Sequence, residues 1–374
     1  MKFLDGFLDK HKERIVGLDI LRSTAILIVV YVHGVNLLPE KLYSLYMNIN
    51  FLKIDGVSIF FVLSGFLIGG ILLKIISRTN FTHKDLLNFW IRRWFRTIPN
   101  YLFVLIGLLV CSLIVHKDFG CFNFKYMFFS QNFASDHPDF FPEAWSLTIE
   151  EWFYLLFPIS CYGFYKIIKN KAKSILISAL IFLFIPLILR IIKYELGIGV
   201  DNFDSEFRKI MILRLDSLMY GVIAAYLNFK KPGLWNKYKY HFLVSGIFFI
   251  ILLLLNPLNW KDFYKPLRFN IESITAFCFL PFLSSLKSTK VKALDVFFVF
   301  ISLISYSMYL LNFSPVLYYL IPTINSLIGR NDFPIEEVFV SNYIIYYSAT
   351  IIGSYLLYRF YENPMTKLRD KIIK

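Results

Sequence analysis

The stretch GLDILRSTAILIVVYVHGVN, residues 17–36, is an almost unbroken apolar run that also carries an arginine and a histidine. A helix needs about 20 mostly apolar residues to cross the hydrocarbon core of a bilayer. Arg22 and His33 are eleven residues apart, so on a helix they lie within about 20° of the same face and about 16 Å apart along the axis. The stretch therefore predicts a membrane-spanning helix with two ionisable groups on one face.

Further apolar segments of similar length follow along the chain, and the composition agrees with them. Hydrophobic residues make up 57% of the sequence and charged residues 18%, against about a quarter charged in soluble domains. We therefore predict an all-α, polytopic membrane helix bundle of about ten transmembrane helices, forming a single integral membrane domain over residues 1–374 with no appended soluble domain. The expected spans are 17–38, 54–75, 98–115, 145–165, 175–192, 210–229, 242–256, 269–286, 294–320 and 339–359.

Lys and Arg are distributed unevenly between the segments that join these spans. Cytoplasmic loops of membrane proteins carry an excess of both residues. With a cytoplasmic N-terminus, every inward-facing segment is basic, and together they hold 26 of the 40 Lys and Arg. The pattern predicts that both termini are cytoplasmic, in a multi-pass protein of the cytoplasmic (inner) membrane. The inward-facing segments are 1–16, 74–97, 166–174, 230–241, 287–293 and 359–374.

The net charge of +14 does not indicate a nucleic-acid-binding protein. Its Lys and Arg form short clusters between apolar runs and make no single basic stripe or arm. No CxxC motif occurs, and His137 beside Asp136 and Asp139 in one loop is weak evidence for a metal site. We therefore expect neither a metal nor nucleic acid, and the sequence carries no signal for an oligomeric state.

Several expected spans carry polar groups that are costly inside a bilayer, about 2.5–3.5 kcal/mol for a charge at its centre. Five spans bring such groups to the outer half of the membrane, so we expect them to form one cluster with Glu150 near His33. Glu150 could equally be an ion-pair partner of Arg214. The groups are His33, Asp55, Ser58, Glu150, Arg214, Asp216 and Asn312.

Other charged residues lie closer to the cytoplasm. Asp19 is three residues before Arg22, which is ion-pair spacing on a helix. The basic segment RRWFR, residues 92–96, places Arg93 and Arg96 on one helix face. Such a pair can bind phosphate. The positive-inside rule alone also explains the two arginines, and the spacing by itself favours that explanation.

Seven motifs give the chain a resemblance to acyltransferase family 3, whose members O-acylate bacterial surface glycans. The similarity runs from Gly17 to about Lys371. The motifs are GLDILRSTAILIVVYVH (17–33), GVSIFFVLSGFLIGG (56–70), RRWFRTIPNY (92–101), WSLTIEEWFYLLFP (145–158), LRLDSLMYG (213–221), ISYSMYLLNFS (304–314) and YENP (361–364).

The chain departs from the pattern of the family at two positions. The ninth-span motif usually ends in His, and here that position is Asn312. The second-span motif often carries Asp where this chain has Ser58. The basic residue and the first-span His are kept as Arg22 and His33, with ten residues between them, and Glu150 is intact as well. We therefore expect an active enzyme.

The resemblance implies transfer of an acyl group, most often acetyl, from cytoplasmic acyl-CoA to a hydroxyl of a cell-surface polysaccharide or lipid-linked saccharide. Acyl-CoA is then a co-substrate, and no permanently bound cofactor is expected. Residues expected to bind acyl-CoA are Arg22, Arg93 and Arg96. Residues expected to contact the acceptor or support the site are Asp19, Ser58, Trp145, Ser146, Asp216, Ser305 and Tyr306.

For catalysis, the hypothesis is that His33 acts as general base on the acceptor hydroxyl, because a neutral imidazole near pH 7 suits that task. Glu150 is expected to orient it. Arg214 or Asn312 is expected to stabilise the oxyanion of the thioester. A covalent acyl-His33 intermediate is the alternative route.

Two other classes of membrane protein fit the same intramembrane polar cluster. A secondary transporter uses such residues for substrate and coupling ions, and a glycan flippase or polymerase is a further alternative. The sequence shows neither paired discontinuous helices nor internal symmetry, which favours the acyltransferase.

Overall fold

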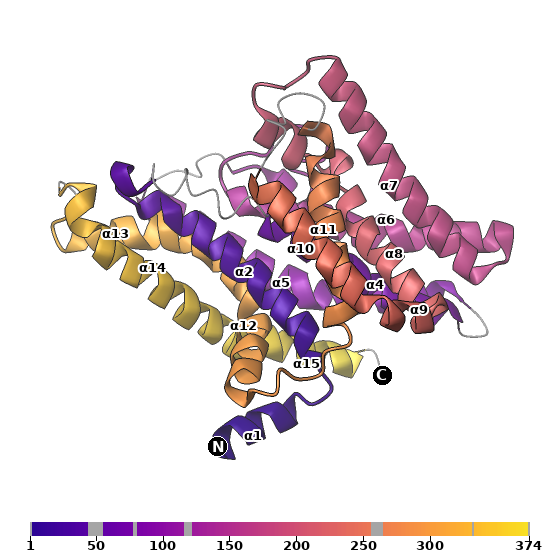
Figure 1. Cartoon of the computed structure of the whole chain (residues 1–374). Helices are drawn as coiled ribbons and strands as arrows, with labels where there is room; N and C mark the ends of the chain where they lie inside the picture. The colour runs from indigo at the N-terminus through magenta and orange to yellow at the C-terminus, as the bar shows by residue number, and fades with distance from the viewer. Residues whose placement is uncertain are drawn as a thin grey trace.

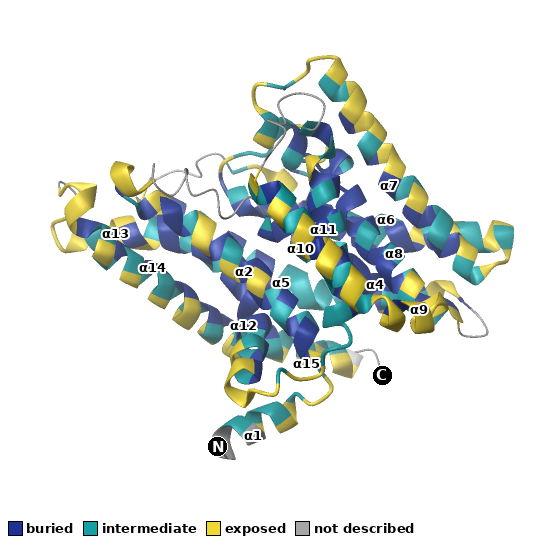
Figure 2. Cartoon of the chain, in the orientation of Figure 1, coloured by how far each residue is buried: buried dark blue, intermediate teal, exposed yellow. Residues whose placement is uncertain are grey.

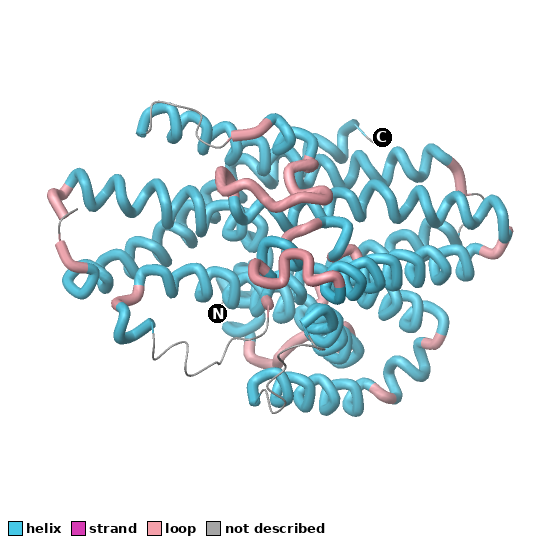
Figure 3. The backbone as a smooth tube through the Cα atoms, turned by 90° about the horizontal axis from the view of Figure 1, so that it is seen from above, coloured by secondary structure: helices cyan, strands magenta, loops and turns pink. Residues whose placement is uncertain are grey.

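The computed structural model describes residues 2–43, 55–77, 81–115, 122–255, 265–330 and 333–372. Throughout these ranges the regular structure is helical and no strand occurs (Figure 3). The long helices are α2 (Val16–Gly34), α4 (Gly56–Ser77), α5 (His83–Val115), α6 (Trp145–Ile168), α7 (Lys171–Glu195), α8 (Asp216–Lys230), α10 (Lys239–Leu255), α11 (Arg268–Leu283), α12 (Lys292–Leu311) and α14 (Ile335–Leu357).

Shorter helical elements join or flank them. Three are π-helical turns, namely η4 (Asp204–Arg208), η7 (Asn312–Leu320) and η8 (Tyr358–Glu362). The others are α1 (Lys2–Lys10), η1 (Val35–Leu37), η2 (Phe124–Phe128), η3 (Pro142–Ala144), η5 (Met211–Leu213), α9 (Pro232–Lys237), η6 (Lys265–Leu267), α13 (Ile321–Leu327) and α15 (Asn363–Ile372).

Within the described residues, each expected span falls on one of the long helices; residues 54 and 256, at the ends of two expected spans, lie outside the described residues. Among the described residues, five helical stretches are long and apolar enough to cross a membrane, which makes the chain a membrane protein, and its regular structure there is helical. It stays a prediction that the remaining helices also cross the membrane and that the termini are cytoplasmic. Both ends of the chain lie on one side of the bundle (Figure 1). The five stretches are Val16–Leu37, Gly56–Ser77, His83–Val115, Lys171–Glu195 and Lys292–Leu327.

Two expected boundaries are wrong. The third span, expected from residue 98, belongs to α5, which begins at His83 and continues through Pro99. Arg93 and Arg96 therefore lie on the same helix as the span. The sixth span, expected from residue 210, begins as an α-helix only at Asp216, because Arg214 has a φ of −129°, outside the α-helical region.

Helix α4 lies at the centre of the bundle and packs closely on α8. A Cβ atom added to Gly65 would lie 1.9 Å from the carbonyl oxygen of Leu218. One added to Gly221 would lie 1.9 Å from the carbonyl oxygen of Val62. Small residues let membrane helices approach to backbone contact, so these two glycines fix the α4–α8 distance.

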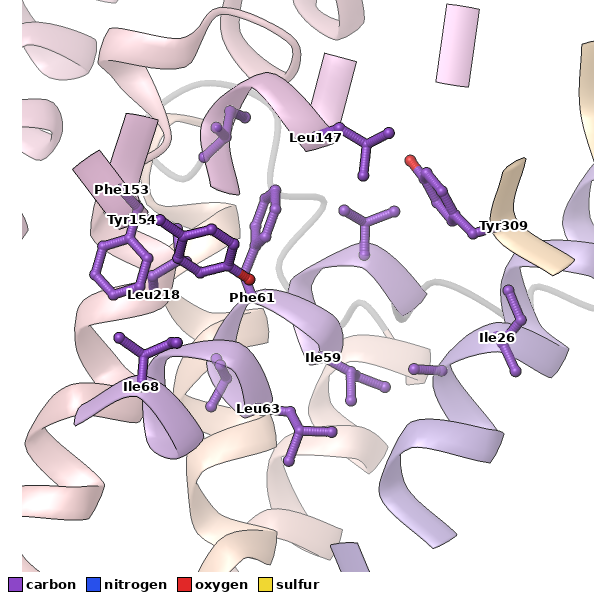
Figure 4. Close-up of a cluster of buried hydrophobic side chains, with 14 of the residues drawn as sticks. Ile26, Ile59, Phe61, Leu63, Ile68, Leu147, Phe153, Tyr154, Leu218 and Tyr309 are labelled. Carbon is purple, nitrogen blue, oxygen red and sulfur yellow. The ribbon is translucent and has the colours of Figure 1, made fainter. Parts of the chain in front are cut away.

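Buried residues lie mainly on the helices at the centre of the bundle, and exposed residues lie mainly at its outside (Figure 2). Ile26, Phe61, Leu147 and Leu218 come from four helices and belong to one apolar cluster (Figure 4). Many outward-facing side chains are also apolar, including Phe184 of α7. An apolar exterior around an apolar core is what a lipid solvent requires.

Candidate active site

His33, at the end of α2, is held by the side chain of Asn312. The imidazole Nδ1 lies 2.5 Å from Asn312 Oδ1. The Asn312 amide nitrogen donates to the carbonyl oxygens of Met308 (2.7 Å) and Tyr309 (3.0 Å). Because these bonds use the amide N–H groups, the oxygen must face His33, and Nδ1 must carry the proton. The other ring nitrogen, Nε2, is thereby left with a lone pair.

The π-helical turn η7 supplies this arrangement. It follows α12 directly and contains Pro315, which lacks a backbone N–H. Ser314 N–H bonds the Glu143 carboxylate at 2.9 Å and so leaves the helical hydrogen-bond pattern. π-helical turns occur frequently at functional sites. Here the turn positions Asn312 towards His33 and Ser314 towards Glu143.

The half-buried imidazole faces a cavity of about 380 Å³, called the outer cavity here. Two ion pairs lie in its wall: Arg208 is 3.1 Å from Asp55, and Arg268 is 3.0 Å from Glu272. Besides His33, the polar and aromatic lining residues are Asp55, Glu143, Trp145, Phe203, Asp204, Arg208, Lys209, Arg268, Phe269, Glu272, Tyr309 and Phe313.

Two further cavities continue from the outer one towards the α1 end of the bundle. The inner cavity, of about 100 Å³, shares Val57 and Tyr309 with the outer cavity. A basic cavity of about 440 Å³ shares Arg22, Leu67 and Arg96 with the inner one. The polar residues of the inner cavity are Arg22, Ser64, Arg93, Arg96, Thr97, Ser146, Glu150, Tyr154, Ser305, Tyr306 and Tyr309.

Tyr309 forms the wall between the inner and outer cavities. Its hydroxyl donates to the Glu143 carbonyl oxygen at 2.8 Å, so the 2.6 Å contact with Ser146 is a bond in which the Ser146 hydroxyl donates. Trp145 lines the outer cavity beneath the Arg208 guanidinium, 4.9 Å from its ring. The expected residues Trp145 and Ser146 therefore both lie where the two cavities meet.

Glu150 does not lie beside His33, and the expectation that it orients the imidazole is wrong. Its carboxylate accepts a bond from the Tyr154 hydroxyl at 3.2 Å and lines the inner cavity. It does not pair with Arg214 either: that guanidinium donates to Ser58 at 3.2 Å and lies 3.9 Å from Asp55. Glu150 shares the inner cavity with the basic residues.

Arg214 and Asn312 are poorly placed as oxyanion donors. The amide N–H groups of Asn312 are occupied by backbone carbonyls. Arg214 lies behind the wall of the outer cavity, with its guanidinium 3.8 Å from the Phe269 ring. Asn312 positions His33, and Arg214 supports Ser58 and Asp55.

Two expected site residues take part in other ion pairs. Asp19 pairs with Arg14, five residues earlier, and not with Arg22. Asp216 pairs with the fully buried Arg190 at 2.7 Å. As Arg214 and Asp216 are two residues apart, each needed a partner elsewhere in the chain, and both have one. Asp216 lines none of the three cavities.

The remaining expected residues are Ser58, Ser305 and Tyr306. Ser58 donates towards Asp55 and Glu272, both at 3.1 Å. Ser305 and Tyr306 line the inner cavity, where the Tyr306 hydroxyl donates to the Thr97 carbonyl oxygen at 2.8 Å.

Sequence reasoning missed several residues of these cavities. The basic cavity includes Arg14 and Arg369, which come from opposite ends of the chain. Glu143, Arg208 and Glu272 line the outer cavity. Glu143 lies two residues before the span expected over residues 145–165, and this position outside the span gave no indication of its contact with Ser314. No group of three His, Cys, Asp or Glu side chains is arranged to hold a metal ion in the described part of the chain.

Burial raises the pKa of Glu143 from its ordinary value to about 7. Between pH 4.5 and 7 the folded chain then binds more protons at this site than the unfolded chain, so stability falls as pH rises. At about 1.4 kcal/mol per pKa unit, the loss is on the order of 3 kcal/mol, and it stops above pH 7. Thermal unfolding in detergent at several pH values measures it. In Glu143→Gln, the loss of stability between pH 4.5 and 7 should disappear. If the variant and the parent lose the same stability over this range, the raised pKa of Glu143 is contradicted.

An all-helical membrane bundle, with a histidine in one cavity and arginines in the cavities behind it, has the features of a membrane-embedded enzyme. A family model described as an acyltransferase domain matches residues 15–359. The chain therefore belongs to acyltransferase family 3.

Curated relatives agree with this family. "Putative O-acetyltransferase SACOL0978" of Staphylococcus aureus (strain COL) is 30% identical over 392 residues, covering 97% of this chain and 59% of the relative. "O-acetyltransferase OatA" of Staphylococcus aureus (strain NCTC 8325 / PS 47) is 28% identical over 378 residues, covering 94% and 57% respectively. The chain thus spans somewhat more than half the length of these relatives. No solved structure matches it significantly.

Proposed function

We propose that the protein transfers an acyl group, most simply acetyl, from cytoplasmic acyl-CoA to a hydroxyl of a cell-surface polysaccharide or lipid-linked saccharide. The observation that carries this proposal is the row of three adjoining cavities, from Arg22 and Arg96 through Tyr309 to His33. A donor and an acceptor that approach from opposite faces of a membrane need such a path.

The basic cavity suits the phosphates of acyl-CoA. Four arginines line it beside three acidic residues, of which Asp19 pairs with Arg14. Guanidinium groups bind phosphate with paired, charge-assisted hydrogen bonds. The arginines are Arg14, Arg22, Arg96 and Arg369, and the acidic residues are Glu13, Asp19 and Glu362. The pantetheine arm would continue into the inner cavity and bring the thioester towards Tyr309. In this proposal, the basic cavity and both termini lie on the cytoplasmic side of the cytoplasmic membrane.

His33 is the general base in this proposal. Its unprotonated Nε2 removes the proton of the acceptor hydroxyl, whose oxygen attacks the thioester carbonyl carbon. The carbon–sulfur bond breaks, and the CoA thiolate takes the proton from His33, so no net proton is gained or lost. Asn312 keeps the ring in the tautomer that this step requires.

The acceptor binds in the outer cavity. Its paired carboxylates and guanidinium groups offer both acceptors and donors to sugar hydroxyls. The aromatic rings of Trp145, Phe203 and Phe269 line the same cavity and can pack against a sugar ring.

The decisive experiment uses purified protein in liposomes with labelled acetyl-CoA. Transfer of label to a saccharide acceptor, or slow hydrolysis of the thioester, supports an acyltransferase. Movement of a solute across the bilayer without transfer or hydrolysis supports the transporter alternative.

The same assay tests the donor site through Arg96, which lines both the inner and the basic cavity. Charge-assisted hydrogen bonds contribute about 1.5–3 kcal/mol, so Arg96→Gln should raise the KM for acetyl-CoA roughly 10- to 100-fold. Arg92→Gln is the matched control, since Arg92 is exposed on the same helix and lines none of these cavities. Equal KM values for the two variants would exclude Arg96 from donor binding.

A further inference from the structure

A fourth cavity, of about 400 Å³, lies apart from the row that leads to His33, and none of its described lining residues lines a cavity of that row. It is formed where the last turns of α4 and α8 meet the turn between α6 and α7. This is the membrane face that the basic loops mark as cytoplasmic. With that predicted topology, we expect the cavity to open near the lipid head groups of that face.

Its rim is basic. Lys169, Lys171 and Lys230 line the cavity, and no Asp or Glu is among its lining residues in the described part of the chain. No ion pair joins Lys169 or Lys230 to any residue within the described ranges. The segments 162–177 and 222–240, which bring these lysines together, contain no acidic residue at all. An anion in the cavity would therefore meet positive charge on several sides.

The inner wall of the cavity is apolar. Leu73, Ile76 and Ile175 are buried there, and the exposed ring of Phe229 forms its edge. The positive-inside pattern requires basic loops, but it does not require a cavity with an apolar wall. A basic rim above apolar side chains matches an amphipathic ligand whose charged end faces the cytoplasm.

The exposed surface of α7 continues from this cavity. Leu180, Phe184 and Ile188 recur every four residues and are 38%, 50% and 52% exposed. Residues four apart lie on one face of a helix, so they form an apolar stripe along α7. The stripe gives an acyl chain a path away from the cavity, which a free inorganic anion would not use.

We propose that this cavity binds the phosphate head group of an anionic phospholipid of the cytoplasmic leaflet. The lysines contact the phosphate as point charges, and the positive end of the α7 dipole, which begins at Lys171, faces it as well. The glycerol and the start of the acyl chains pack on Leu73, Ile76 and Phe229. The lipid then joins three helices that otherwise leave a gap.

The test uses native mass spectrometry of the purified protein with dioleoyl phosphatidylglycerol or dioleoyl phosphatidylcholine. The parent protein should retain phosphatidylglycerol in preference. Near a membrane surface, each lysine raises the affinity for an anionic lipid about fivefold. The triple variant Lys169→Gln, Lys171→Gln, Lys230→Gln should therefore bind phosphatidylglycerol on the order of 100-fold more weakly. Equal retention of the two lipids by the parent, or undiminished binding by the triple variant, would overturn the proposal.

Two controls separate this site from general surface charge. The double variant Lys287→Gln, Lys290→Gln removes charge from another basic loop that lines none of the four cavities and should bind as the parent does. Ala172→Trp fills the cavity without changing charge, and it should abolish binding. Inorganic phosphate is tested alone: stabilisation by phosphate with no retained lipid would assign the cavity to free phosphate and overturn the lipid assignment.

Discussion

Replacing His33 with alanine is expected to reduce acyl transfer by about 10²- to 10⁴-fold, the usual contribution of a general base. The effect should fall on kcat, because the imidazole acts on the acceptor hydroxyl and lies away from the arginines of the basic cavity. Two readouts measure it: label transfer in liposomes, and O-acetylation of cell-surface saccharides by mass spectrometry. Protein abundance in the membrane must match that of the parent.

Asn312 provides a second variant for the same mechanism. Asn312→Ala removes the acceptor at Nδ1 and lets the imidazole turn and change tautomer, so kcat should fall while the KM for acetyl-CoA stays constant. His241 is an exposed histidine of α10, and His241→Ala is the matched control with unchanged activity. Full activity of His33→Ala at normal abundance would remove His33 from the mechanism.

The sequence predicted that His33 and Asn312 lie at one level of the bundle, but it did not predict the partners of the other polar groups. Position along a span gives depth directly, since each residue advances a helix by about 1.5 Å. His33 and Asn312 were expected at one depth, and they are in contact. Glu150 faces a different cavity, because the side to which a residue points depends on which helices are neighbours. Neighbours are set by packing such as the Gly65 and Gly221 contacts.

The predicted ion pair of Asp19 was wrong for a related reason. Asp19 had a suitable partner in Arg22 by helical spacing, yet it pairs with Arg14, which precedes α2 and is free to fold back on it. Glu143 was overlooked because its partner, Ser314, is 171 residues away. Periodicity identifies residues on one helix face and carries no information about contacts between distant segments.

The second large expected effect concerns stability, at the pair formed by Arg190 and Asp216. Both side chains are fully buried, and Arg190 also donates to the Pro266 carbonyl oxygen at 2.6 Å. Asn270 donates to Asp216 at 2.8 Å. Breaking a buried pair by removing one partner costs about 3–5 kcal/mol, because the remaining charge is left unpaired. Asp216→Asn should therefore lower the free energy of unfolding by about that amount, measured by unfolding in mixed micelles.

The alternative, in which Asp216 acts in the reaction, makes the opposite prediction. Asp216 lines none of the cavities that lead to His33, so the kcat of the molecules that remain folded should equal that of the parent. Replacing both partners with apolar residues, as in Arg190→Met with Asp216→Leu, should recover part of the lost stability, since no charge then stays unpaired. The stability is recovered only in part, because the Pro266 carbonyl oxygen loses the hydrogen bond that Arg190 donates to it. An Asp216→Asn variant with normal stability and no activity would instead return Asp216 to the catalytic site.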